Sequence, residues 1–235
     1  MNLNAALSAE ARQKDLSPQK DGGSLGIRAS RLGQLMTVNW RQALILAGKA
    51  YNVTVGDISA GAAESLITGG GAGATIDSDQ PEMAVGVPAG YYLIPMRFQC
   101  SARVDLDADA ETGEILLFAD TTQNIPLPIA ASSTVETPAN LLGGGEAFPG
   151  YAQSAVTTDI TDPLMSVLLL SELIRNADNG TAGSASFIRL NALYEPLAAP
   201  IFKGPCSIIA CWGGTAAVTA AATFDFAAVP ASWVE

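Results

Sequence analysis

An acidic run carries the most suggestive chemical spacing in the chain. Between Asp105 and Glu111 a carboxylate stands at every second position, as the first ligands of a calcium-binding loop do. The comparison fails at the sixth position, where Ala110 replaces the required glycine, and at the twelfth, where Leu116 replaces the glutamate. We therefore expect a solvated acidic turn without a metal ion. The candidate ligands for a structural calcium ion, the alternative reading, are Asp105, Asp107 and Asp109.

Carboxylates are also the groups with which an enzyme could work here, because the chain contains no histidine. That absence removes the Ser-His-Asp and Cys-His nucleophiles, histidine metal sites and the commonest general base. A glycosidase needs only two carboxylates, but no pair among Asp105–Glu114 is marked by its spacing. Trp40 and Trp212 could stack on sugars, although aromatic residues in strands usually belong to a core or an interface. We expect no enzyme and no catalytic residue, with a carboxylate-based glycosidase as the weaker alternative.

Cysteines and glycines offer no cofactor site. Cys206 and Cys211 form one C-x4-C pair, and Cys100 stands alone, so a tetrahedral zinc site lacks ligands. The three cysteines lie among apolar residues and are expected to be small buried hydrophobes with free thiols. The glycine run 69–73 is not followed by Gly-Lys-Ser/Thr or by a good helix, so it predicts a flexible loop. We expect no cofactor.

The charge of the chain is low in density and uneven. Charged residues make up 15% of the chain, below the usual quarter, and 49% of residues are apolar. Residues 1–41 hold six basic and three acidic side chains, a net charge of +3, whereas the remaining 194 residues hold six basic and 20 acidic, a net charge of −14. The acidic body argues against direct nucleic-acid binding. The basic segment either contacts an acidic partner, through Arg12, Arg28 and Arg31, or is a solvated tail.

No segment predicts contact with a membrane. The longest apolar stretches, around 167–170 and 207–211, are far shorter than the roughly 18 residues that a spanning helix needs. The sequence from Met1 to Asp15 has no hydrophobic core of the secretory type. We therefore expect synthesis in a host cytoplasm without signal-directed export.

Short β-prone runs separated by turns dominate from Thr37 onward. The turn Pro88–Gly90 predicts the end of one strand and the start of the longest, Tyr91–Leu106. Residues 109–113 predict a hairpin that pairs this strand with Glu114–Ala119. The remaining expected strands lie within 38–55 and at 83–87, 206–212 and 221–229.

The stretch Pro163–Ala177 is open to two interpretations. Asp162 before Pro163 is typical of a helix start, with apolar residues following on one face. Alternatively the stretch is a strand that pairs with 185–194 across the turn-forming Asp178-Asn-Gly180. The Asn-Gly turn between two apolar runs favours the strand.

Taken together, the pattern predicts an all-β protein. About eight to ten short strands, with turns near every ten residues and few helical periods, are typical of an antiparallel β-sandwich or jelly roll. We expect residues 1–35 to form an extended N-terminal arm and 36–235 one jelly-roll-like sandwich domain. Within that domain, residues 120–162 are rich in proline, glycine, serine and threonine and predict long surface loops, with brief strand pieces, suited to contacts.

Residues 36–235 resemble the virion structural proteins of tailed phages. The resemblance rests on Ile201-Phe-Lys-Gly-Pro205, the strand Cys206–Trp212, Gly213-Gly-Thr215, Thr223–Val229 and the final Pro-Ala-Ser-Trp-Val, together with Trp40–Ala47, Asp77-Ser-Asp-Gln-Pro81 and Pro88-Ala-Gly-Tyr91. It is a likeness of strand order and style, and it carries no functional residue with it.

The resemblance implies a non-enzymatic virion component of the capsid, decoration (cement) or spike type. Such proteins work by subunit contacts, so the implied partners are the chain itself, as a homo-oligomer with a trimer favoured, and other virion proteins. The implied location is the virion. The alternative is an extracellular carbohydrate- or calcium-binding β-sandwich module.

Overall fold

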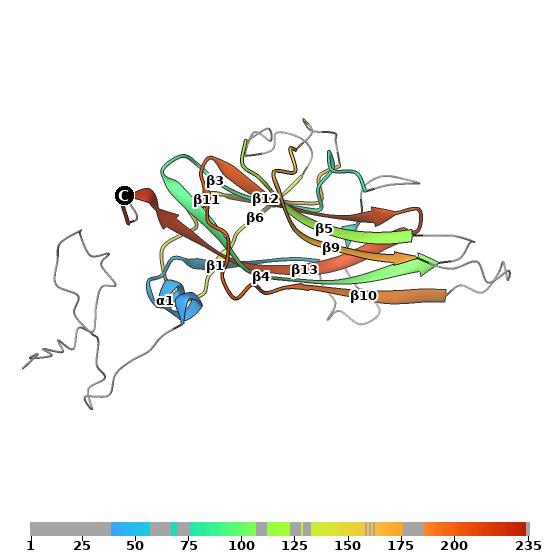
Figure 1. Ribbon diagram of the computed structural model, residues 1–235, viewed down its shortest axis with the longest axis horizontal. Coiled ribbons are helices and arrows are strands. Elements are labelled where there is room, and N and C mark those ends of the chain that lie inside the picture. The colour runs from blue at the N-terminus through green and yellow to red at the C-terminus, as the bar shows by residue number, and fades with distance from the viewer. Residues whose placement is uncertain are drawn as a thin grey trace, which may run out of the picture.

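The computed structural model describes residues 39–56, 67–69, 76–106, 112–122, 128, 133–157, 159, 161, 163–175 and 186–233. Two antiparallel sheets pack face to face, with a single α-helix at one end of the described part (Figure 1). The elements are α1 Trp40–Leu46, β1 Ala50–Val55, β2 Ile67–Thr68, β3 Met83–Val87, β4 Tyr91–Leu106, β5 Thr112–Asp120, β6 Thr134–Glu136, β7 Ala139–Asn140, β8 Tyr151–Ser154, β9 Val167–Arg175, β10 Ser186–Tyr194, β11 Phe202–Lys203, β12 Cys206–Gly214, β13 Ala217–Pro230 and a 3₁₀ turn at Ala231–Trp233. The predicted all-β sandwich is confirmed.

The strand order is that of a jelly roll. Sheet 1 runs β10-β4-β13-β1-β7, with β11 also paired to β4 and β2 to β13, and sheet 2 runs β6-β8-β3-β12-β5-β9. The eight long strands pair in a nested way: β1 with β13, β3 with β12, β4 with β10, and β5 with β9. These four nested pairs are divided between the two sheets, two pairs in each. As a result β13 lies beside β4 and β12 lies beside β5, as in two Greek keys.

Strand alternation directs one side chain in two into the space between the sheets. Aromatic rings fill one part of this core: Tyr51, Phe148, Phe224 and Phe226 pack with centroids 5.1–6.0 Å apart. Trp212 of β12 is completely buried in the same cluster. The core therefore lies between the two sheets, as the sequence pattern predicted.

A β-bulge at Met96 turns an apolar side chain of β4 to the outer face of sheet 1. Phe226 of β13 pairs with Pro95 and Asp225 pairs with Arg97, so Met96 is an extra residue in β4. Met96 packs with α1 and with Ile94 in a small cluster on the outer face of sheet 1. The bulge thus provides an apolar contact surface for α1 at one end of a largely polar face.

Helix α1 lies where β structure was expected. The expected β-prone runs within 38–55 included Trp40, Leu44 and Leu46, and these residues are helical. Asn39 is the N-cap and accepts a hydrogen bond from the Gln42 backbone N–H at 2.8 Å. Because Trp40, Leu44 and Ile45 are spaced like one helix face and pack on the cluster around Met96, tertiary packing stabilises this seven-residue helix.

Both expected hairpins are wrong, although their strands exist. Strands β4 and β5 lie in different sheets, and so do β9 and β10. The ambiguous stretch does contain a strand, β9, but it pairs with β5. The chain crosses from one sheet to the other at each expected turn because nested long-range pairing, and not the nearest turn, sets the partners in this topology.

The described part of the region at 120–162 contains three short strands of two to four residues. Strands β6, β7 and β8 lie within it, and β8 extends sheet 2 beyond β3. The expected arm, residues 1–35, lies outside the described residues.

Candidate assembly surface

The predicted metal and partner residues are mostly outside the described part. Asp105 lies in β4 opposite Phe187 of β10, whereas Asp107 and Asp109 fall outside the described residues, as do Arg12, Arg28 and Arg31. Among the residues that the structure describes, no group of three or more histidine, cysteine or acidic side chains could hold a metal ion. The calcium reading therefore stays a prediction.

The cysteines are buried free thiols, as predicted. Burial, with a smaller contribution from Asp120, raises the pKa of Cys206 to about 12. Burial raises the pKa of Cys100 and of Cys211 well above the ordinary thiol value, with the Glu82 carboxylate adding to both effects. All three therefore stay protonated and unreactive in the folded protein at neutral pH.

The two tryptophans named as possible sugar platforms are occupied in other ways. Trp212 is 0% exposed, so it belongs to the core. Trp40 packs on the cluster around Met96 and donates its indole N–H to the Leu197 carbonyl at 3.0 Å. Neither presents an open ring face to a sugar in the manner that the glycosidase reading requires.

The two lateral sides of the sandwich differ in the strands that end them. On one side the terminal strands are β6 and β7, of three and two residues. On the other they are β9 and β10, of nine residues each, which contact one another across the sandwich (Figure 1). A terminal strand has one row of backbone N–H and C=O groups without a strand partner, and natural proteins usually keep such edges short. The β9–β10 side is thus the long open edge of the described fold.

Strand β9 departs from a simple inward–outward alternation. A register shift between Leu117 and Phe118 of β5 places Leu168 opposite Phe118, on the outer face of sheet 2. Leu168 and Leu173 are 52% and 56% exposed. We call the exposed apolar residues of and before this strand the β9 patch: Leu164, Met165, Val167, Leu168 and Leu173.

A second group of exposed apolar residues lies in β10 and in the segment after it. Ile188 and Leu193 of the strand are exposed, and beyond it Leu197 and Ile201 are 96% and 62% exposed. We call these four residues the β10 patch. Large exposed aliphatic side chains concentrated along one side of a monomer are typical of a surface that another molecule covers.

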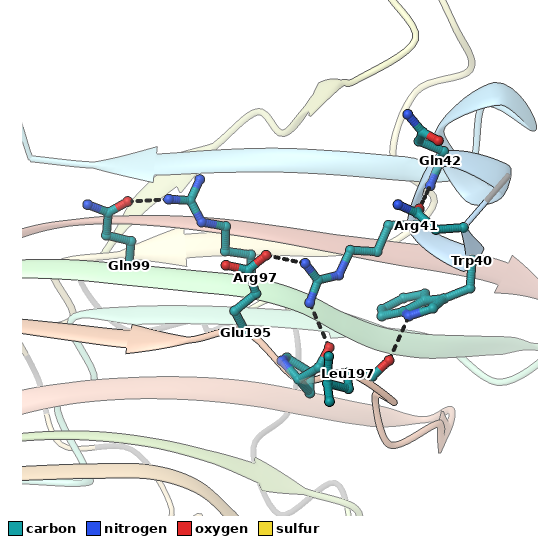
Figure 2. A network of polar contacts seen from close by, with 9 residues as sticks. Trp40, Arg41, Gln42, Arg97, Gln99, Glu195 and Leu197 are labelled. Atoms are coloured by element: carbon teal, nitrogen blue, oxygen red, sulfur yellow. Dashed lines mark hydrogen bonds and ion pairs between the residues drawn. The ribbon is translucent and has the colours of Figure 1, made fainter.

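A polar network holds the segment after β10 in place (Figure 2). Arg41 of α1 forms an ion pair with Glu195 and donates to the Pro196 carbonyl at 2.6 Å. Its guanidinium also lies 5.2 Å from the centroid of the Trp40 ring. Together with the Trp40–Leu197 bond, these contacts fasten residues 195–197 to α1, so Leu197 is presented from a fixed backbone.

The outer face of sheet 1 has a different character. Beyond α1 it presents polar side chains that bond to one another across strands: Asn52 donates to Asp225 at 2.7 Å, and Ser101 donates to Asn191 at 2.9 Å. Thr54 and Thr223 lie 3.2 Å apart, oxygen to oxygen. This face has its polar groups largely satisfied within the chain.

What this arrangement can do is bind a surface. Its chemistry is a pair of strand edges flanked by leucines, with Glu172, Arg175 and Arg189 as the charged residues of the two strands. Sequence analysis missed these residues; the signal was the run Val-Leu-Leu-Leu at 167–170, which carries more apolar side chains than a half-buried strand can bury. None of the helices in the described part is long and apolar enough to cross a bilayer.

The chain matches no protein-family model, and no curated protein is significantly similar to it.

Proposed function

We propose that this chain is a non-enzymatic structural subunit of a virus particle, of the phage type, and that it acts by association with copies of itself and with other virion proteins. The observation that carries the proposal is the β9–β10 side, where two long strand edges coincide with exposed leucines in a jelly-roll sandwich. Jelly rolls build viral capsids, although they also occur in lectins and cupins.

Three further observations support an assembly role. The chain lacks histidine, which removes most catalytic chemistry. Its thiols are buried and protonated. Its charged fraction, 15%, is low, and the centres of protein interfaces are depleted in charged residues. Capsid, decoration and spike roles remain equivalent on these grounds.

The test is the native mass of the purified chain by light scattering, measured beside a variant that lacks residues 1–35. A closed oligomer, with a trimer favoured, supports the structural role. Loss of that oligomer in the shortened variant would give the basic segment with Arg12, Arg28 and Arg31 a share in the contact. A monomer for both proteins at every accessible concentration would contradict the proposal.

The second candidate is a carbohydrate-binding module. It is favoured by the outer face of sheet 1, where amide, hydroxyl and carboxylate groups such as Asn52, Gln99 and Asp225 offer partners for sugar hydroxyls. Glycan and calcium binding screens on a monomeric preparation would test it. Saturable binding to a defined glycan without oligomer formation would replace the virion proposal.

A further inference from the structure

We infer that a second copy of this chain docks on the β9–β10 side. The open edges of β9 and β10 in one subunit then contact a strand of its neighbour. The inference rests on the proposed function and specifies where its subunit contact lies. Its occupant is another copy of the chain, and the argument has four steps: hydrogen bonding, area, charge and the condition of the other surfaces.

The hydrogen-bonding step concerns the open rows of β9 and β10. Within the described part of the chain, each of these nine-residue strands pairs on one side only, β9 with β5 and β10 with β4. Alternate backbone groups on the other side point out of the sheet, where a neighbouring strand would satisfy them. Addition of a strand to an exposed edge is a recurrent mode of recognition, in which the main chain supplies affinity and alternate side chains supply specificity.

The area step compares this side with a stable interface. A strand of nine residues is about 30 Å long, and packed sheets lie about 10 Å apart. With side chains on both outer faces included, the side offers a footprint of about 600 Å² for each subunit, from the same spacings. Specific interfaces bury about 800 Å² for each partner. Residues 195–201 follow β10 and present Leu197 and Ile201, and the α1 network fastens the first three of them, so this segment extends the footprint toward that size.

The charge step explains why acidic subunits can meet here. The whole chain has a net charge of −11, so most of its surfaces repel a second copy. The β9 and β10 strands together hold Glu172, Arg175 and Arg189 as their charged residues. The two strands themselves therefore carry one more positive than negative charge, so an acidic second copy approaches them without the repulsion expected elsewhere.

The last step concerns the remaining surfaces of the described part. Polar side chains of the outer face of sheet 1 bond to one another. On the outer face of sheet 2, Val156 covers part of the strands and is 4% exposed. The opposite side ends in β6 and β7, which are too short to add a strand of useful length. The exposed apolar residues there, such as Val135 at 74%, flank no long edge and serve as a matched control.

The experiment measures association of the full chain carrying lysine at chosen exposed positions. Leu173→Lys on β9 and Leu193→Lys on β10 place a charge in the expected contact, and Val135→Lys places the same charge on the opposite side. Because these side chains are exposed, each variant should keep the wild-type circular dichroism and melting temperature. Centrally placed interface residues typically cost more than a factor of ten in affinity when removed. We expect at least tenfold weaker self-association for Leu173→Lys and Leu193→Lys, and a change of less than about twofold for Val135→Lys.

Hydrogen exchange provides a second readout of the same contact. As the concentration rises through the association range, backbone amides of β9 and β10 should become more protected, whereas those of β6 and β7 should not. Unchanged association in both leucine variants, or an equal loss with Val135→Lys, overturns the inference while leaving the proposed function intact. A wild-type chain that remains monomeric throughout overturns both.

Discussion

The two outer faces of the sandwich are closed in opposite ways. On sheet 1 most exposed residues are polar and several form cross-strand hydrogen bonds, as between Asn52 and Asp225, whereas Leu193 at its β10 edge is an exposed apolar exception. On sheet 2 the outer face is apolar: Phe118, Ile209 and Cys211 are 0–1% exposed. Other segments of the chain cover part of that second face. Val156 packs on it, and the Val156 backbone N–H donates a hydrogen bond to the Pro81 carbonyl at 3.2 Å, which holds the covering segment in place.

The difference shows where this chain has apolar surface left over. The outer face of sheet 1 needs no cover, because water and neighbouring side chains satisfy its polar groups. The apolar outer face of sheet 2 is covered in part by other segments of the chain. The edge strands β9 and β10 have neither device, because Leu168 and Leu173 on the outer side of β9 and Leu193 on the outer side of β10 stay exposed. This jelly roll can therefore have broad faces that are largely closed and still expose apolar side chains along one side.

The largest expected effect is on the apolar face. Phe118→Ala removes a buried ring beneath the covering segments, and large-to-small changes of this kind cost about 3–5 kcal/mol. Thr223→Ala on the polar face removes only the contact with Thr54 and should cost about 1 kcal/mol or less. Urea unfolding of both variants measures the difference. Similar costs for the two would show that the faces are energetically alike.

The second prediction concerns access to the thiols. Cys211 lies under the cover of sheet 2, whereas Cys100 and Cys206 lie in the core between the sheets. At pH 8 a thiol reagent should modify all three on the order of a thousandfold more slowly than an exposed cysteine introduced by Val135→Cys, because reaction requires opening of the fold. Earlier modification of Cys211 than of the other two would show that the cover opens by itself.

The same thiols predict how stability varies at high pH. Burial raises the pKa of Cys206 from 9.0 to about 12, so the folded state holds its proton where the unfolded chain loses it. The stability that this provides is complete below pH 9 and falls as the pH rises toward the folded value. Cys206→Ala should flatten the decline in melting temperature between pH 9 and pH 11 relative to the wild type.

The fourth prediction tests whether the polar face is held by its own bonds. A double-mutant cycle with Asn52→Ala and Asp225→Ala should give a coupling free energy of about 1 kcal/mol, as expected for a partly buried hydrogen bond to a carboxylate. A coupling near zero would mean that water replaces the bond without cost and that the face is merely solvated.

The smallest expected effect lies at the end of the molecule that carries α1. Lys49 donates to Glu146 at 2.6 Å, and this bond lowers the pKa of the Glu146 carboxyl below its ordinary value. The ion pair therefore stabilises the fold above the ordinary carboxyl pKa, and the effect is lost as the pH falls through the lowered value. An NMR titration should show the pKa of Glu146 rising in Lys49→Met and staying unchanged in Lys203→Met.

Much of the fold could be predicted from local sequence, but the pairing could not. Val85, Ile208 and Phe224 stand in runs whose composition and length indicate strands whatever their partners. The partner of each strand is set by burial across the whole domain, so the Asn-Gly sequence at 179–180 favoured a hairpin between β9 and β10 that the topology does not contain. Helix α1 was missed because its apolar side chains also suit a strand, although Asn39 in front of good helix formers was a usable signal.

The candidate surface was harder to predict than the fold. Exposure of Leu168 follows from a register shift opposite Leu117 and Phe118, which no single segment of sequence contains. The network of Trp40, Arg41 and Glu195 joins residues more than 150 positions apart in the chain. Such contacts appear only after the strands have found their partners.

The nested order of the strands also has a consequence for synthesis. Strand β13 lies between β4 and β1, and β12 lies between β3 and β5, so the centres of both sheets are the segments made last. On the ribosome, β1, β3, β4 and β5 must wait for partners that lie far along the chain, and long-range β pairing is slow even then. We therefore expect folding to follow translation of β13, so that a polypeptide ended before that strand presents no folded β9–β10 edge.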